Sequence, residues 1–265
     1  MSCKLSKMLV NQLRKDFLKI CGNPKIKRVL SRTKEILPPT PPNNNRGNSI
    51  HLTTIQKTIL GFGSSLVSLY NPTRIDMLNC CAEILCSTSL QKILNDMKLD
   101  SVGRRILEEK PNICTIANAE KLIELPEKTF GFALGKFLMK HAANIETRTA
   151  VRFIDDPNLA YIMERCRQIH DCLHVVLNIP TNKVGEITIK WVEALNAGLT
   201  TTYLAAIVGG AHIPRKEREN FIQRYLPLAI LNGKNTVKYY LIYWEQMYEE
   251  DLGSLRRKIQ VTAFP

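Results

Sequence analysis

The sequence lacks the usual features of a secreted or membrane-spanning protein. Its eight cysteines include no C-x-x-C pair, and we expect neither a disulfide framework nor a redox motif, because both depend on paired thiols. No window of 18 residues is apolar enough for a transmembrane helix, which needs about 20 such residues. With 265 residues and 45% hydrophobic content, the chain is long enough for one large core or two small ones.

Acidic residues are scarce in the first 48 positions. This segment contains 11 of the 37 Lys and Arg residues, but only Asp16 and Glu35 among the 24 acidic residues. The remaining residues therefore carry 26 basic and 22 acidic side chains, a net charge of +4. Most of the overall charge of +13 belongs to the N-terminal end, so it does not indicate a nucleic-acid partner for the rest of the chain.

The N-terminal segment has the pattern of a mitochondrial transit peptide. Apolar residues recur every four positions among basic ones, as in an amphipathic helix; they are Leu5, Leu9, Leu13 and Phe17, among Lys4, Lys7, Arg14, Lys15 and Lys19. The proline-rich run 37–45 then cannot continue a helix. We expect residues 1–48 to be a transit peptide and proline-rich linker, and residues 49–265 to be the folded domain. An amphipathic helix of the mature fold, which Asp16 would suit, is the alternative.

From Leu52 onward, the spacing of apolar residues predicts helices almost throughout. The expected segments are 53–70, 73–85, 89–98, 101–109, 118–124, 128–142, 157–177, 182–196, 200–211, 215–231 and 237–258. Asp156 before Pro157 is a start signal, and Gly198 is a stop signal. Strand-like runs such as 151–154 are too few for a sheet. The expected fold class is all-α, with a single multi-helix domain.

A possible metal-binding pattern lies where two predicted helices meet. His170, Asp171 and His174 form H-D-x-x-H, and Glu186 follows after eleven further residues. Histidines four positions apart project from one helix face, and here that face is also the apolar one. We therefore expect inward imidazoles that need polar partners. A helical hairpin at Pro180 could bring Glu186 over them, giving ligands that suit zinc, iron or manganese better than calcium.

The same residues also allow an ordinary structural interpretation. Buried histidines are often satisfied by backbone groups or by a neighbouring acid. Glu186 and Lys190 have the spacing of a surface ion pair, and Glu193 on the same face continues the pattern of a solvated stripe. Asp171 diverges from His170 by about 100° on the helix. It is therefore geometrically demanding for both side chains to bind one ion. Asp171 could instead contact the metal ligands without binding the ion itself, or act as the proton carrier.

The combined motif resembles the H-D-x-x-H-x(11)-E signature of a ubiquinone (coenzyme Q) biosynthesis family, the one numbered fourth in its pathway. The flanking sequences are similar as well, namely Leu69-Tyr70-Asn71-Pro72, residues 152–156, Pro180-Thr181-Asn182 and Lys190-Trp191-Val192-Glu193. The similarity extends from about Ile50 to the C-terminal region.

The resemblance implies an all-helical mitochondrial protein, bound peripherally to the matrix side of the inner membrane. It implies other ubiquinone-biosynthesis proteins as partners in a multi-subunit complex, and it is compatible with a homodimer. It implies zinc, with His170, Asp171, His174 and Glu186 as ligands. The implied activity is that of a lyase, which removes the C1 carboxylate from 4-hydroxy-3-methoxy-5-polyprenylbenzoate to give the methoxy-polyprenylphenol; a linked hydroxylation at C1 is a variant. The alternative is a non-catalytic, lipid-binding scaffold with a structural metal.

Residues 199–211 contain no charged side chain. As a helix they would be about 20 Å long, too short to cross a bilayer. A buried core helix is the ordinary interpretation. Because the implied substrate carries a polyprenyl tail, we instead expect the segment to line the path of the tail or to dock on the inner membrane. Arg215, Lys216 and Arg218 would then lie near anionic headgroups.

Overall fold

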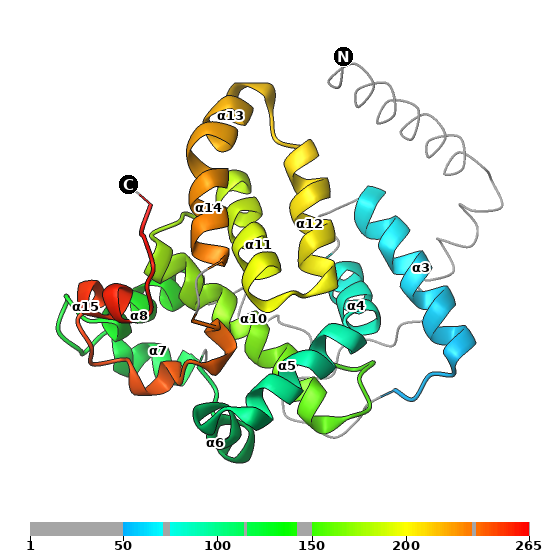
Figure 1. Cartoon of the computed structure of the whole chain (residues 1–265), viewed down its shortest axis with the longest axis horizontal. Helices are drawn as coiled ribbons and strands as arrows, with labels where there is room; N and C mark the ends of the chain where they lie inside the picture. Colours follow the sequence, from blue (N-terminus) through cyan, green and yellow to red (C-terminus); the bar gives the residue numbers. More distant parts are fainter. Residues whose placement is uncertain (1–49, 71–74, 114–115, 142–149, 235–236, 265) are drawn as a thin grey trace. The chain divides into compact units, whose positions relative to one another are not determined.

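The computed structural model describes residues 50–70, 75–113, 116–141, 150–234 and 237–264, and these fold into helices joined by turns (Figure 1). Within these ranges, β-type pairing is limited to an isolated bridge between Thr129 and Asp251. The predicted all-α class is confirmed. The predicted leader, 1–48, and the Asn71-Pro72 helix boundary lie outside the described residues.

The elements keep the labels of Figure 1. They are α3 (Thr54–Tyr70), α4 (Ile75–Leu85), α5 (Ser87–Leu99), α6 (Ser101–Glu109), α7 (Ile116–Leu122), α8 (Phe130–Lys140), α10 (Pro157–Leu177), α11 (Lys183–Ala197), α12 (Thr200–Ala211), α13 (Arg215–Asn220), the π-helical η1 (Phe221–Tyr225), α14 (Leu226–Gly233), the 3₁₀ turns η2 (Tyr239–Leu241) and η3 (Trp244–Gln246), and α15 (Leu252–Lys258).

Local signals set the ends of α10 and α11. The Asp156 carboxylate accepts hydrogen bonds from the backbone N–H groups of Asn158 and Leu159, at 2.7 and 3.1 Å, and so caps α10 as predicted. The Asn182 side chain caps α11 in the same way. Gly198 then ends α11 with a φ of 71°, a conformation that suits glycine. Capping residues that can be recognised in the sequence therefore fix the hairpin on which the site is built.

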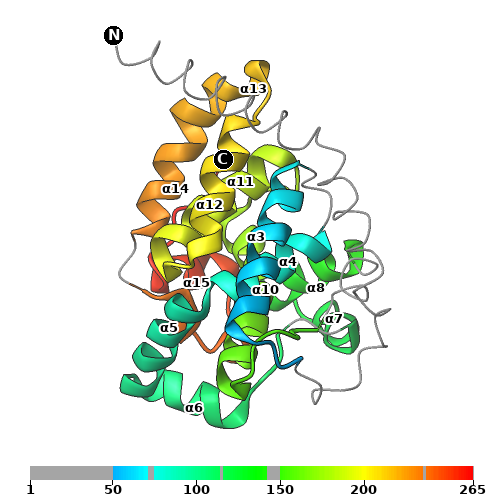
Figure 2. The ribbon, with the colours of Figure 1, turned by 90° about the vertical axis from the view of Figure 1, so that its right-hand side faces the viewer.

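Helix α10 is the central element of the fold. It packs against α5, α8, α11 and η2, and in both views it lies between α11, α12 and α14 above and α5 and α6 below (Figures 1 and 2). From Gln168 to Leu177 every residue except His170 is buried. This half of α10 is buried on nearly all faces, whereas a surface helix buries only one apolar stripe. Its polar side chains therefore need hydrogen-bonding partners inside the protein.

An ion pair inside the protein ties α10 to the C-terminal region. Arg165, only 1% exposed, donates to both carboxylate oxygens of Glu245 at 2.8 and 3.1 Å, and also to the carbonyl oxygen of Ile242. This two-pronged geometry compensates the cost of burying the guanidinium. It joins residues 80 positions apart in the chain.

The prediction of one helix over 237–258 is wrong. The segment forms η2, η3, a turn and the short α15 instead. Its backbone groups bond to other elements: the Tyr239 N–H donates to Asn196 Oδ1, and the carbonyls of Tyr248 and Glu250 accept from the start of α8. The run 239–244 is entirely aromatic or aliphatic. Aromatic and β-branched residues have a weak preference for helix because the helix restricts their side chains. Here the run contributes to the core, and Trp244 is fully buried.

No helix in the described ranges is both long and apolar enough to cross a bilayer.

Candidate metal centre

The hairpin of α10 and α11 brings His170, His174 and Glu186 together. The two Nε2 atoms lie 3.2 Å apart, and each faces one oxygen of the Glu186 carboxylate. The distances are 3.2 Å from His170 Nε2 to Oε2, and 3.3 Å from His174 Nε2 to Oε1. Among the described residues, this is the cluster of histidine and acidic side chains that could hold a metal ion.

The spacing of these donor atoms fits one small cation. Zinc binds imidazole nitrogen at about 2.0–2.1 Å, and the tetrahedral angle then separates two ligand atoms by roughly 3.3 Å. The separation of the two Nε2 atoms, 3.2 Å, is close to that value, and each nitrogen lies 3.2 or 3.3 Å from a different oxygen of the Glu186 carboxylate. Nitrogen and carboxylate donors suit zinc, iron or manganese. The residues present therefore fit the metal that the sequence motif implies.

The backbone and an aromatic ring orient His174. In the tautomer that leaves Nε2 free to bind, its Nδ1–H donates to the carbonyl oxygen of Ile179 at 2.9 Å. The Phe137 ring, from α8, stacks on the imidazole with centroids 5.5 Å apart and planes 20° apart. The His174 side chain is only 1% exposed. The His174 imidazole is therefore held on two sides.

Two charged side chains of α11 surround the other edge of His170. Glu193 Oε1 lies 2.8 Å from His170 Nδ1, and Lys190 Nζ lies 2.8 Å from Glu193 Oε2. Lys190 Nζ also lies 3.3 Å from His170 Nδ1. Glu193 is buried. Its charge is therefore compensated by the imidazole and by the ammonium group rather than by water.

A glycine allows Glu186 to reach the histidines. Gly185 packs so tightly against the corner after α10 that an added Cβ would lie 1.9 Å from the Pro180 carbonyl oxygen. The same corner contains Ile179, whose carbonyl oxygen orients His174. The first turn of α11, with Glu186 in it, can approach α10 because residue 185 has no side chain.

The charges of the cluster shift its pKa values in opposite directions. Burial and Lys190 act to lower the pKa of His170, but Glu193 and Glu186 outweigh them and raise it to about 9. Burial acts to raise the pKa of Glu186, yet hydrogen bonds to the two histidines bring it far below its usual range. Burial likewise opposes ionisation of Glu193, but Lys190 and His170 lower its pKa to about 2. Without metal, a proton on His170 compensates the two carboxylates.

The centre is open on one side. The Glu186 side chain is 43% exposed, whereas those of the two histidines are largely or wholly enclosed. A metal ion held by these three side chains would have room for a further ligand from solvent, which is the arrangement of catalytic rather than closed structural sites.

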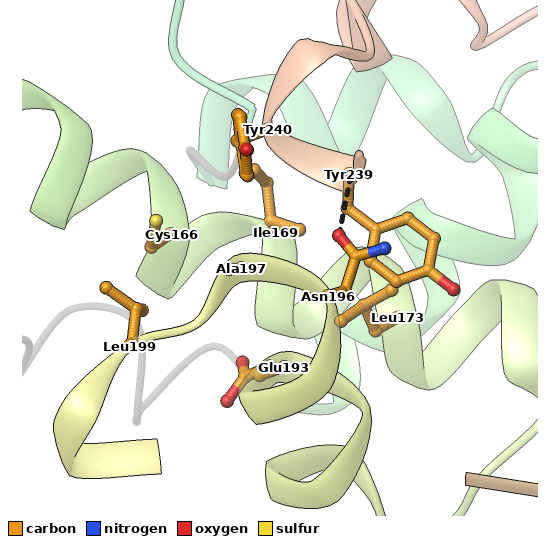
Figure 3. Close-up of a pocket in the computed structure, with 9 residues that line it drawn as sticks. All are labelled: Cys166, Ile169, Leu173, Glu193, Asn196, Ala197, Leu199, Tyr239 and Tyr240. Carbon is orange, nitrogen blue, oxygen red and sulfur yellow. Dashed lines mark hydrogen bonds between the residues drawn. The ribbon is translucent and has the colours of Figure 1, made fainter. Parts of the chain in front are cut away.

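Glu193 also lines a small cavity, and Figure 3 shows its carboxylate among the residues around it. Its volume is about 20 Å³, enough for one water molecule. Most of the lining is apolar, from Ile169 and Leu173 on α10 and from Leu199, Tyr239 and Tyr240. Glu193 therefore contacts His170 and also borders a small, largely apolar space.

The structure places the four predicted ligands unequally. His170, His174 and Glu186 converge, while Asp171 is buried beside them on α10 and is outside the group of three. The contacts of Glu193 with His170 and Lys190 were not predicted from the sequence; the alternative interpretation placed Glu193 on a solvated stripe and paired Lys190 with Glu186. Glu193 lies seven residues after Glu186, about two turns along the same face. That spacing was the available signal.

Comparison with known proteins gives consistent results. A family model described as "Coenzyme Q (ubiquinone) biosynthesis protein Coq4" matches residues 47–265. The chain is 42% identical over 215 residues to a protein of Aedes aegypti, a match that covers 81% of this chain and 78% of that protein. It is 43% identical over 213 residues to a protein of Drosophila grimshawi, a match that covers 80% of this chain and 81% of that protein. Both are described as "Ubiquinone biosynthesis protein COQ4 homolog, mitochondrial".

A solved structure shares the fold. It is that of a Nostoc punctiforme PCC 73102 protein provisionally assigned to ubiquinone biosynthesis, with a TM-score of 0.62 and 16% identity, covering 78% of this chain and 99% of that one. At this identity the likeness concerns the fold alone.

Proposed function

The chain belongs to the coenzyme Q (ubiquinone) biosynthesis protein Coq4 family, and within ubiquinone biosynthesis we propose that it is a metal-dependent lyase. The membership of this family that the sequence predicts is thereby confirmed. The proposed reaction removes the C1 carboxylate from 4-hydroxy-3-methoxy-5-polyprenylbenzoate and gives the methoxy-polyprenylphenol. The observation that carries the proposal is the convergence of His170 Nε2, His174 Nε2 and the Glu186 carboxylate, open on the Glu186 side.

The residues of the centre suit this chemistry. His170, His174 and Glu186 would hold the ion. A bound zinc, iron or manganese ion supplies a Lewis acid that positions a substrate carboxylate or phenolate oxygen. Decarboxylation breaks the bond from C1 to the carboxylate, releases CO₂ and requires a proton to reach C1. Asp171, the acidic residue beside His170 on α10, is our candidate for the proton carrier.

The proposed location is the matrix side of the mitochondrial inner membrane, within a complex of ubiquinone-biosynthesis proteins. The names of the relatives support the mitochondrial assignment. Support for the membrane surface comes from α12, which has no charged residue and exposes Leu204 and Ile207 while burying Thr202 and Ala206. A core helix would bury its large apolar residues rather than its small ones.

Exposed basic residues follow this surface. Arg215 and Lys216 are exposed, whereas Arg218 donates hydrogen bonds to the carbonyl oxygens of Ala211 and Ile213. An uncharged apolar helix next to basic residues suits a bilayer with anionic headgroups. It would place the polyprenyl tail of the substrate close to the protein.

A second function, a non-catalytic scaffold with a structural metal, is favoured by another observation. Helix α3 exposes Ile55, Ile59 and Phe62, which recur at helical spacing. An apolar stripe of this kind is typical of a protein-binding surface. The scaffold and the lyase share the metal residues, so activity must separate them.

The test is a direct assay. The purified chain, loaded in turn with Zn²⁺, Fe²⁺ or Mn²⁺, is supplied with a short-chain prenylated methoxy-hydroxybenzoate, and CO₂ release is measured. The expected result is release above background that disappears in His174→Ala. No release with any of the three metals, from a folded and metal-loaded protein, would favour the scaffold.

A further inference from the structure

We propose that Glu193 is a positioning residue of the metal centre, which aims His170 Nε2 at the ion by accepting the Nδ1–H hydrogen bond. Lys190 holds Glu193 in place. The inference deepens the proposed function and rests on it, because it assigns a role around the same centre. Neither residue belongs to the group of three possible ligands.

The two nitrogens of His170 face different partners. Nε2 faces the other two residues of the group, at 3.2 Å from both His174 Nε2 and Glu186 Oε2. Nδ1, on the other edge of the ring, lies 2.8 Å from Glu193 Oε1. A neutral imidazole carries one proton. With that proton on Nδ1 and shared with Glu193, the lone pair of Nε2 is left for the ion, and the ring cannot turn without losing the bond.

Lys190 acts on Glu193 rather than on the imidazole. Its Nζ lies 2.8 Å from Glu193 Oε2, but 3.3 Å from His170 Nδ1. An ammonium group cannot donate to a nitrogen that already bears a proton. The shorter contact is therefore the functional one, and it fixes the carboxylate so that the two oxygens serve different partners.

The surroundings of Glu193 are enclosed and largely apolar, which makes its hydrogen bond to His170 hard to replace. The carboxylate is buried, and the adjoining space of about 20 Å³ is largely apolar (Figure 3). Hydrogen bonds to charged acceptors are strong in such surroundings. His174, in contrast, is oriented by a backbone carbonyl that no side-chain replacement removes. Of the two histidines, His170 is the one whose Nδ1 hydrogen bond depends on another side chain.

The experiment measures binding of Co²⁺ alone to the purified full-length chain, by titration of its visible absorption. We compare the wild type with Glu193→Ala, Glu193→Gln and Lys190→Met. Glu83→Gln is the matched control, since Glu83 is a buried carboxylate that pairs with Arg167 of α10 but lies outside the donor group. Carboxylates that orient metal-bound histidines typically contribute 10- to 100-fold in affinity.

The expected result is a Co²⁺ Kd weakened by roughly 10- to 100-fold in Glu193→Ala. The loss is smaller in Glu193→Gln, whose amide oxygen can still accept the bond, and in Lys190→Met. The Co²⁺ spectrum should change in Glu193→Ala, while Glu83→Gln keeps the affinity and spectrum of the wild type. If Glu193→Ala does not fold, the isosteric Glu193→Gln decides.

Two negative outcomes are distinguishable. Wild-type affinity and spectrum in the folded Glu193 variants would overturn the inference and leave the metal centre standing. A wild type that binds no Co²⁺, or that binds it equally well after His174→Ala, would overturn the metal centre and the inference with it.

Discussion

His170 Nε2 and His174 Nε2 face each other at a distance of 3.2 Å. Two unprotonated imidazole nitrogens at this distance would direct their lone pairs at each other, so either a proton or a cation must compensate them. The adjoining Glu186 carboxylate adds a negative charge to the same point. The centre therefore favours positive charge, and a metal ion bound there would compete with a proton.

The first prediction concerns the ligands. Replacing His170 or His174 by alanine should abolish stoichiometric metal binding, because each removes one of three donors. Metal content is measured by elemental analysis after gel filtration, and circular dichroism reports the helical fold. His212→Ala, an exposed histidine at the end of α12, is the control. Undiminished metal content in the His170/His174 double variant would exclude this site, and unfolding on metal loss would make it structural.

The second prediction concerns pH. In the metal-free protein the pKa of His170 is raised from 6.5 to about 9, so protonation of His170 stabilises the folded state. This contribution is complete below pH 6.5 and is lost as the pH rises through 9. The pKa of Glu193 is lowered from 4.5 to about 2, so its contribution is present above pH 4.5 and is lost as the pH falls through 2.

Denaturant titration of the metal-free protein should therefore show a free energy of unfolding that decreases between pH 6.5 and 9. His170→Ala should lack this decrease. The zinc-loaded protein should not show it either, because the ion replaces the proton. A metal-free protein with equal stability at pH 6.5 and 9 would contradict the assignment of the proton to His170.

The third prediction concerns the corner between α10 and α11. Gly185→Ala should destabilise the fold by about 1–3 kcal/mol, the usual cost of overpacking, because the added Cβ meets the Pro180 carbonyl. It should also weaken metal binding, since Glu186 follows directly. Gly210→Ala is the control: nothing lies within 4 Å of its added Cβ in α12, so stability should hold or rise slightly. Thermal melts of both variants, and Co²⁺ titration, test this.

Those parts of the fold that depend on local signals could be predicted from the sequence. The start of α10 at Asp156-Pro157, the end of α11 at Gly198 and the full extent of α12 follow from caps and apolar spacing. The region 237–258 could not be predicted in this way. Its conformation depends on Asn196 and on residues at the start of α8, which lie far from it in sequence.

The candidate site also has a part that could be predicted from the sequence and a part that could not. The convergence of His170, His174 and Glu186 follows from an i, i+4 pair and a hairpin. The role proposed for Glu193 depends on the packing of α11 on α10, which brings its carboxylate to His170 Nδ1; the sequence pattern also allowed a solvated stripe at this position. The carbonyl that orients His174 belongs to Ile179, and no pattern of side chains reveals a backbone partner.

The fourth prediction concerns the N-terminal residues. A chain that starts at Asn48 should fold with an unchanged melting temperature, because residues 1–48 are proposed to direct import only. Ile50 already contacts the domain, since its N–H donates to the carbonyl oxygen of Arg152 at 2.7 Å. The shortened and full-length chains are compared by calorimetry. A melting temperature lower by several degrees would instead support the amphipathic helix as part of the mature fold.

The fifth prediction separates membrane docking from core packing in α12. Ile207 is 59% exposed, whereas Ala206 beside it is fully buried. Ile207→Asp should reduce binding to liposomes that contain anionic lipid while the circular dichroism spectrum and melting temperature stay unchanged. Ala206→Asp should unfold or strongly destabilise the chain, because it buries an unpaired charge. Arg215→Glu should weaken liposome binding mainly at low salt, where headgroup attraction is least screened. If Ile207→Asp binds liposomes as the wild type does, α12 is not the docking surface, and its exposed residues must serve a different contact.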